Sequence, residues 1–368
     1  MIKSKIKFES QVNSSFFKEV KERVDEYFKK TGYTRKANKA MIIKIVIIGI
    51  LFFGSYGAIV SGIFSEKSML LLAILFGFSN ALIAFNISHD AAHGALFVNQ
   101  KLNLIFSYTF NLIGVNRYIW NIKHNVSHHA YTNVPGYDLD IDQSKVARLV
   151  NSCELKWFHK YQYIYMPLLF PFASLYLVFI KDFQMFSLKK IGTKFIFNHP
   201  KKEYFILFFS KIIYFTYVLV IPIIVLNVYW WKVFLGFIIM HLILGVFLAI
   251  ILFPAHIADD SPFPEPDENG IIHNSWAVHQ VETTTNYGPN NKILCWLSGG
   301  LNTHIAHHLF PGICHIHYFK ITNIIRTIAQ KHRINYRDNT IYGAVRSHIN
   351  FLKIMGRGGC VHVQPAVI

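Results

Sequence analysis

The stretch IIKIVIIGILFFGSYGAIVSGIF at residues 42–64 decides the fold, because nearly all of its side chains are apolar. About 20 such residues in a helix are long enough to cross the hydrocarbon core of a bilayer. Stretches of the same kind follow at 69–88, 204–226 and 231–253. Short connections join the four stretches in two pairs. The sequence therefore predicts an all-α integral membrane protein with four transmembrane helices in two hairpins.

The composition of the chain agrees with this prediction. Hydrophobic residues make up 52% of its 368 residues and charged residues 15%, whereas soluble domains have about 25% charged residues. The formal net charge of +17 would suggest nucleic acid in a soluble protein, but the spans exclude a soluble nucleic-acid binder. Basic residues that flank spans instead meet anionic lipid headgroups. The four cysteines form no CxxC pair, so neither a disulfide framework nor a thiolate metal site is expected.

Basic residues also predict the orientation of the helices. Eleven Lys and Arg residues lie in the first 40 positions, and six Lys lie in the connection 181–203. Positively charged loops stay on the cytoplasmic side, so we expect both termini and this connection there. No apolar stretch precedes residue 41, so no cleavable signal peptide is expected. The predicted organisation is a basic arm at 1–40, a membrane domain at 41–320 and a cytoplasmic helical extension at 321–368.

Two weaker apolar stretches are predicted to be helices that lie in the membrane interface. Residues 102–115 are too short to cross a bilayer. Residues 163–180 contain Pro167 and Pro171, which interrupt helical hydrogen bonding. If 163–180 crossed, the lysine-rich connection after it would lie outside.

Histidines gather in three short clusters, HDAAH (89–93), HNVSHH (124–129) and HIAHH (304–308). Residues at i, i+3 and i+4 share one face of a helix, so each cluster could aim its imidazoles at one point. With four crossings, all three clusters lie on the cytoplasmic side, in a helical cap. At this histidine content roughly one pair at spacing i, i+4 arises by chance. The clusters comprise eight histidines: His89, His93, His124, His128, His129, His304, His307 and His308.

Eight imidazoles indicate a metal centre with two ions. A single zinc takes about four ligands, and a catalytic zinc only three. Nitrogen ligands without thiolate are compatible with Fe, Zn, Cu or Ni, and the zinc motif HExxH is absent. Ligand chemistry alone therefore favours a dinuclear site and leaves the metal open.

In their order and spacing the three clusters resemble the histidine boxes of the membrane-bound fatty acid desaturase family. The resemblance covers roughly residues 80–320 and includes GGLN before the third box and HHLFP at its end. The stretch NSWAVHQVETTTNYG (274–288) is similar to the subgroup of bacterial acyl-CoA and front-end, Δ6-type desaturases. This resemblance implies a multi-pass protein of the bacterial inner membrane with a cytoplasmic active site.

The resemblance also implies a site with two Fe ions held by the eight box histidines. A further ligand is expected between the fourth span and the third box, where His256 and His279 are the candidates. His241 lies mid-span, and we expect it to be a hydrogen-bonded buried residue. Metal-bound imidazoles often donate their other N–H to a carboxylate or carbonyl. The candidates for such support are Asp90, Asp138, Asp140, Asp142, Asn86 and Asn302.

The implied activity is an O2-dependent desaturation that inserts a cis double bond into a long acyl chain. The acyl group could be linked to CoA, a carrier or a phospholipid. Many front-end members have Gln where this chain has His304, so the position of the double bond stays open. The arm at 1–40 is too short for a fused cytochrome-b5-like domain, so electrons are expected from a separate ferredoxin or cytochrome b5 type carrier. The basic cytoplasmic face would attract such an acidic partner.

Two alternatives remain from the sequence. A di-iron lipid hydroxylase or ketolase would share the boxes and the metal centre. A non-enzymatic metal-binding protein or transporter is more distant, because transporters place ionisable ligands near the bilayer midplane. Here only His241 is predicted at that depth.

Overall fold

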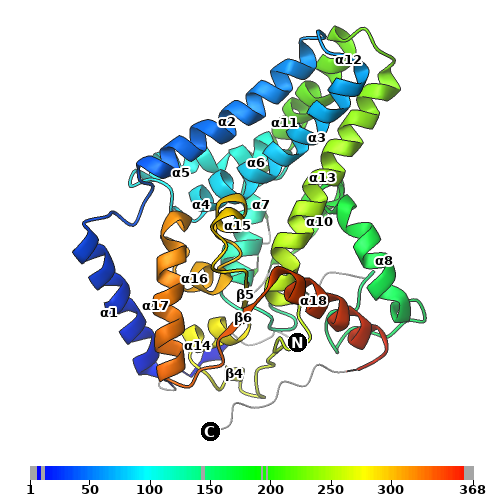
Figure 1. The fold of residues 1–368 in the computed structure, drawn as a ribbon. Helices are drawn as coiled ribbons and strands as arrows, with labels where there is room; N and C mark the ends of the chain where they lie inside the picture. Colours follow the sequence, from blue (N-terminus) through cyan, green and yellow to red (C-terminus); the bar gives the residue numbers. More distant parts are fainter. Residues whose placement is uncertain (1–5, 10–12, 142–145, 192–193, 196–197, 360–368) are drawn as a thin grey trace.

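The computed structural model describes residues 6–9, 13–141, 146–191, 194–195 and 198–359 (Figure 1). Most of this part of the chain is helical. The longer helices are α1 (Ser14–Thr31), α2 (Lys39–Val60), α3 (Glu66–Ile83), α11 (Lys201–Phe215), α13 (Trp230–His256), α17 (Tyr318–Lys331) and α18 (Ile341–Gly356). Shorter helices are α4 (His89–Ala92), α5 (Gln100–Ser107), α6 (Thr109–Leu112), α7 (Arg117–Asn121), α8 (Gln162–Leu169), α9 (Ala173–Tyr176), α10 (Asp182–Ser187), α12 (Ile221–Val225), α14 (Trp276–Glu282), α15 (Lys292–Leu297) and α16 (His304–Leu309).

Five continuous helical segments are long and apolar enough to cross a membrane. They are Lys39–Val60, Glu66–Ala92, His159–Ser187, Lys201–Val225 and Trp230–His256. Four of them match the predicted spans, with ends within four residues of the predicted ones. A multi-pass helical membrane protein is therefore confirmed. The fifth segment contains the stretch that we expected in the interface, so the number of crossings stays a prediction.

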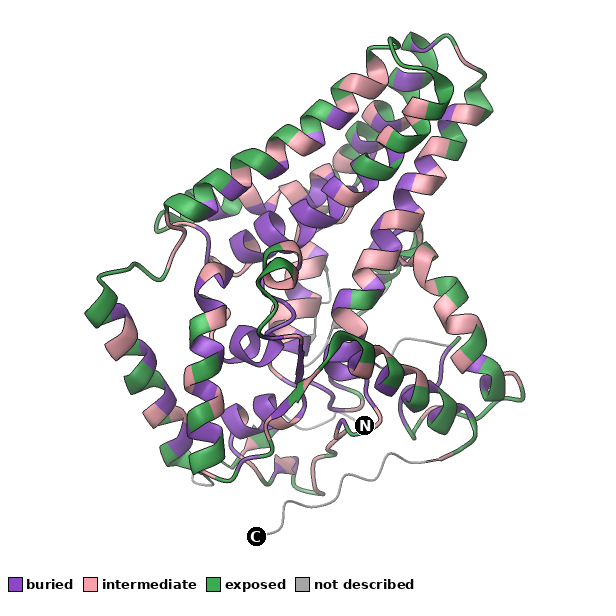
Figure 2. Cartoon of the chain, in the orientation of Figure 1, coloured by how far each residue is buried: buried purple, intermediate pink, exposed green. Residues whose placement is uncertain are grey.

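The two predicted hairpins lie side by side as one bundle. In Figure 1, α2, α3, α11 and α13 run together from the middle of the molecule toward α12. The tips of the hairpins meet, because Lys232 Nζ lies 2.5 Å from Glu66 Oε1. The helices α3 and α13 pack closely where Gly77 faces the Met240 backbone. Ile50 and Phe53 on the outer face of α2 are 67% and 64% exposed, as expected for a surface that contacts lipid (Figure 2).

The segment His159–Ser187 is an irregular helix. Its sequence places Pro167 inside α8 and Pro171 in the turn before α9, and a π-helical turn spans Leu177–Lys181. Proline removes a backbone donor and bends a helix. The middle of the segment packs on α13, where Ser174 Oγ lies 2.9 Å from His241 Nδ1.

The cap below the bundle carries the histidine clusters, and the short helices that hold them are buried inside it (Figure 2). The helices α1, α14, α16 and α17 share one hydrophobic cluster there, with Phe16, Val281, Ile305 and Ile325 fully buried. Two small parallel sheets join distant segments: β1 (Lys7–Phe8) with β4 (Ile271–Ile272), and β5 (Thr285–Tyr287) with β6 (Arg337–Asn339). A local antiparallel pair is formed by β2 (Lys190–Ile191) and β3 (Lys194–Phe195). The C-terminal segment after residue 320 thus packs into the cap through α17, β6 and α18.

Candidate metal centre

The three histidine clusters stand on three local structures that converge below α3 and α13. A π-helical turn at Ala84–Ser88 leads into α4, which holds His89. The second cluster lies on a π-helical segment, Ile122–His128, that continues α7. The third cluster forms α16. The structure brings all eight box histidines together, with His256 from the end of α13 as a ninth.

The nine histidines form two groups of four with one residue between them. His89, His93, His124 and His307 make the first group, and His128, His256, His304 and His308 make the second. In each group, one nitrogen from every ring lies within 4.8 Å of the others. His129 lies between the groups, with its Nε2 2.9 Å from His307 Nε2 and 3.1 Å from His124 Nε2.

The π-helical segment explains how the second cluster serves both groups. A π-helix bonds residue i to residue i+5, and here the His129 N–H donates to the His124 carbonyl at 2.9 Å. His124 and His129 therefore lie one turn apart and face the first group, while His128 turns to the second. The sequence predicted that His124 and His128 aim at one point. The structure does bring one nitrogen of each within 4.8 Å of the other, together with an oxygen of Asp140, and it also places each ring in a different four-histidine group.

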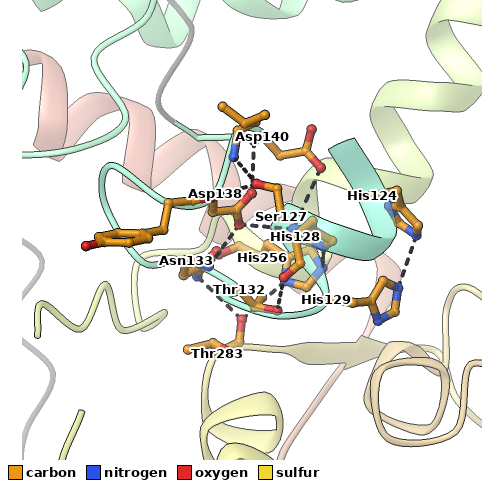
Figure 3. A network of polar contacts seen from close by, with 12 residues as sticks. His124, Ser127, His128, His129, Thr132, Asn133, Asp138, Asp140, His256 and Thr283 are labelled. Atoms are coloured by element: carbon orange, nitrogen blue, oxygen red, sulfur yellow. Dashed lines mark hydrogen bonds and ion pairs between the residues drawn. The ribbon is translucent and has the colours of Figure 1, made fainter. Parts of the chain in front are cut away.

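Hydrogen bonds hold the rings of the second group in place (Figure 3). The His128 Nδ1–H donates to Asp138 at 3.0 Å, and that carboxylate also accepts the Asn133 N–H. His128 Nε2 and His308 Nε2 then lie 3.2 Å and 3.1 Å from His256 Nε2. Because the Nδ1 atoms are engaged outward, the Nε2 atoms are free to meet at one point.

Burial keeps most of these imidazoles neutral, the form that binds a metal. It lowers the pKa of His124, His129, His307 and His308 well below the usual value, and neighbouring imidazoles lower it further. Burial lowers the pKa of His304 to about 3. Burial also acts to lower the pKa of His128, but the Asp138 carboxylate outweighs it and the net shift is upward. The Asp138 contact thus makes His128 the more basic ligand.

The donor set fits metal ions. Both ring nitrogens of His89 are buried without a hydrogen-bond partner in the described part of the chain, and so are His93 Nε2 and His129 Nδ1. Buried polar atoms rarely lack a partner, because desolvation then goes uncompensated. Unpartnered nitrogens that point into a cluster of neutral imidazoles are explained if they coordinate metal.

The two histidines that we considered outside the boxes differ in position. His256 belongs to the second group, whereas His279 lies outside both groups. The His279 Nε2–H donates to the Thr132 carbonyl at 2.9 Å, so this residue supports the turn after the second box. His241 is buried between Ser174 and Tyr214 and hydrogen-bonds to both, as expected of a satisfied core residue.

The supporting side chains that we considered fall into two sets. Asp138 contacts His128 directly, and Asp140 pairs with Lys123 while its other oxygen lies 3.7 Å from His128 Nδ1. Asp90 accepts the His315 Nδ1–H at 2.8 Å. The amides of Asn86 and Asn302 donate to backbone carbonyls of Leu82, Leu297, Tyr287 and Gly288, and these bonds hold the backbone rather than the histidine rings. Asp142 lies outside the described residues.

Sequence reasoning missed several residues of the site. Gln280 Oε1 accepts the His308 Nδ1–H at 2.7 Å, and Trp120 stacks on His124 with ring centroids 4.4 Å apart. His315 links Asp90 to Lys44, whose Nζ lies 2.9 Å from His315 Nε2. Gln280 follows His279 in NSWAVHQVETTTNYG (274–288), but its contact with the third box depends on folding.

An apolar cavity lies between the hairpins but away from the metal centre. It has a volume of about 250 Å³, and Ala73, Phe237 and Met240 are on its wall. Met240 is sixteen residues before His256 on α13, which corresponds to about 24 Å along the helix. The cavity is therefore separate from the histidine groups.

Comparison with known proteins agrees with this geometry. A family model described as fatty acid desaturase matches residues 67–340. An sn-1 linoleoyl-lipid 6-desaturase of Arthrospira platensis is 33% identical over 354 residues, which cover 96% of this chain and 95% of that protein. The enzyme of the same name from Synechocystis sp. is 30% identical and covers 93% of this chain and 96% of its own length. An acyl-lipid (8-3)-desaturase of Physcomitrium patens is 33% identical over 96% of this chain and 74% of its own.

Proposed function

The chain belongs to the fatty acid desaturase family, and we propose that it inserts a cis double bond into the acyl chain of a membrane lipid at a di-iron centre. The observation that carries the proposal is the meeting of nine histidines from four distant segments, eight of them in two four-nitrogen groups and His129 beside them. The first iron would be held by His89, His93, His124 and His307, and the second by His128, His256, His304 and His308. When bound, the two irons supply the O2 activation that removes hydrogen from an unactivated CH2 group, a step no side chain can perform.

The residues of the chain prepare the site for this chemistry. Burial keeps the rings deprotonated at the ligating nitrogens. Asp138 and Gln280 fix the orientation of His128 and His308. The apolar side chains of the cap exclude water, which prevents side reactions of the oxidant.

We propose an acyl chain esterified in a membrane lipid as the substrate. The named relatives from Arthrospira platensis and Synechocystis sp. act on linoleoyl lipids, and a lipid substrate reaches the cap directly from the bilayer. Electrons would come from a separate acidic carrier of the ferredoxin or cytochrome b5 type. The net charge of +17 supports electrostatic attraction of such a partner.

A cis double bond in the products is tested by fatty-acid methyl ester analysis. The full chain is expressed in a bacterial host that lacks an equivalent desaturase, together with a ferredoxin and its reductase, and linoleic acid is supplied. We expect a new unsaturated acid that is absent with the empty vector. A hydroxy acid instead would move the chain to the hydroxylase alternative. Absence of any new product, with no iron in the purified protein, would overturn the proposal.

We further propose four crossings, with both termini and the metal centre on the cytoplasmic side. His129 and His307 touch, so an even number of crossings separates them. Three apolar segments lie between these residues, so an odd number of them does not cross, and we propose that it is one. Both ends of His159–Ser187 pack on the cap: Gln162 Nε2 donates to the Leu352 carbonyl at 2.7 Å, and Met185 packs on Ile119 and Ile122 beside the second box. These contacts favour His159–Ser187 as the segment that does not cross, because both of its ends lie on the side of the membrane where the cap is.

Cysteine labelling tests this topology. Single cysteines replace the exposed residues Glu154, Lys189 and Asn227 in a background whose native cysteines are serine. We expect Glu154→Cys and Lys189→Cys to react with a membrane-impermeant maleimide only from the cytoplasmic side. The control, Asn227→Cys at the hairpin tip, should react only from the opposite side. Labelling of positions 154 and 189 from different sides would mean that His159–Ser187 crosses.

A further inference from the structure

The two four-histidine groups differ in what their outward ring nitrogens contact. In the second group every Nδ1–H has an acceptor. His128 donates to Asp138 at 3.0 Å, His256 to the Thr283 carbonyl at 3.3 Å, His304 to the Leu301 carbonyl at 2.8 Å and His308 to Gln280 Oε1 at 2.7 Å. Every imidazole of this group is therefore held by a hydrogen bond on its outward side, and one of the four acceptors is the Asp138 carboxylate.

The first group has almost no such support within the described residues. The carboxylate nearest to His89 is Asp90, whose Oδ1 lies 4.0 Å from His89 Nδ1, beyond hydrogen-bond distance. Both ring nitrogens of His89 lack a partner, so whichever one coordinates a metal, the other has no acceptor. Within the same part of the chain the His93 ring makes no hydrogen bond, and the His124 ring bonds to His129 of the cluster itself. The remaining member, His307, has the Tyr318 hydroxyl at 3.5 Å, the limit of a hydrogen bond.

The groups also differ in burial. All four rings of the second group are buried, whereas His93 and His124 of the first group are only half-buried. A small molecule therefore reaches the first group more easily than the second. The second group is thus both the more buried and the more fully hydrogen-bonded of the two.

We propose that the two metal sites are inequivalent, and that the second group binds its ion more tightly than the first. Outer hydrogen bonds to ligand histidines are worth about 10–100-fold in metal affinity. Asp138 and Gln280 are the positioning residues that produce this difference, because they fix His128 and His308 with their Nε2 atoms toward the metal. This inference rests on the proposed di-iron centre.

A chelator competition on the purified full-length protein tests the inference. The protein is loaded anaerobically with Fe²⁺ in detergent, and the bound iron is measured by mass spectrometry at increasing chelator concentration. We expect two ions per chain that are lost in two steps, separated by about 10–100-fold in chelator concentration. Loss of both ions in one step would overturn the inference and leave the di-iron proposal intact. Fewer than two ions at saturation would overturn the di-iron proposal, and the inference with it.

Ligand variants assign the steps to the groups. His93→Ala breaks the first group and should leave one ion with the tight step. His304→Ala breaks the second group and should leave one ion with the weak step. The opposite assignment would overturn the inference.

Variants of the positioning residues test the cause. Gln280→Leu should weaken the tight step by about 10-fold or more, whereas Gln280→Glu keeps an acceptor for His308 Nδ1–H and should restore it. Asp138→Asn should also weaken the tight step and leave the weak step in place. Tyr318→Phe is the matched control, because it removes the long contact of the first group and should change neither step appreciably. A tight step that is unchanged in both Gln280→Leu and Asp138→Asn would show that these residues do not set the difference.

Discussion

Replacement of His128 by alanine is expected to abolish desaturation, with the product falling to about 1% of the wild-type level or less. His128 is buried in the second histidine group, where its Nε2 lies 3.2 Å from His256 Nε2 and its Nδ1–H donates to Asp138. The substitution removes one of the four proposed ligands and leaves the Asp138 carboxylate without its imidazole partner. Loss of an outer partner alone lowers metal affinity by about 10–100-fold, and loss of the ligand itself lowers it further. The methyl ester analysis and the iron content of the purified protein measure both effects.

His273→Ala is the matched control for this variant. His273 is a histidine of the same cap, but it is exposed, and its ion pairs with described residues are to Glu9 and Asp267 at the surface. Its removal should leave both the product and the iron content at the wild-type level. Wild-type activity in His128→Ala would exclude this residue as a ligand, whereas a loss of folded protein in the variant is detected by gel filtration before the activity is compared.

Much of the architecture could be predicted because the signals are local. A run of apolar residues reports a span regardless of the rest of the chain, and the four predicted spans were found with ends within four residues of the structure. The histidine boxes are equally local, since each lies within six residues. Their assembly could be expected because the predicted hairpins return the chain to one side of the membrane.

What the sequence did not reveal depends on backbone irregularity and on distant contacts. The π-helical segment Ile122–His128 divides the box-two histidines between the two four-histidine groups, and its i, i+5 bonding leaves no clear pattern in the residues. The role of Gln280 depends on the packing of α14 against α16. Gln280 and His308 are 28 residues apart in the sequence, so no local pattern reveals their contact. The fifth apolar segment illustrates a different limit: length and composition allow a crossing, and only its packing partners argue against one.

Replacement of Gly245 by alanine is expected to destabilise the protein by about 1–3 kcal/mol. Gly245 lies in α13, where it faces the irregular segment His159–Ser187. A Cβ atom built at this position would lie 1.9 Å from the Pro171 carbonyl oxygen. That oxygen belongs to the backbone and cannot rotate away, so the two helices must separate. The separation would also stretch the neighbouring hydrogen bonds between Ser174 and His241.

Gly49→Ala is the matched control, because it makes the same substitution in a helix where the new methyl group meets no neighbour. Gly49 lies inside α2, and a Cβ atom there would meet nothing within 4 Å. Alanine is favoured over glycine in a helix by about 1 kcal/mol, so Gly49→Ala should be neutral or stabilising. The two variants make the same chemical change, and only the close contact with Pro171 distinguishes them. Thermal stability in detergent, followed by gel filtration after heating, should therefore fall for Gly245→Ala alone. An equal or higher stability of Gly245→Ala would mean that the segment His159–Ser187 does not pack on α13 at this point, and it would remove the anchor that holds the middle of that segment against the bundle.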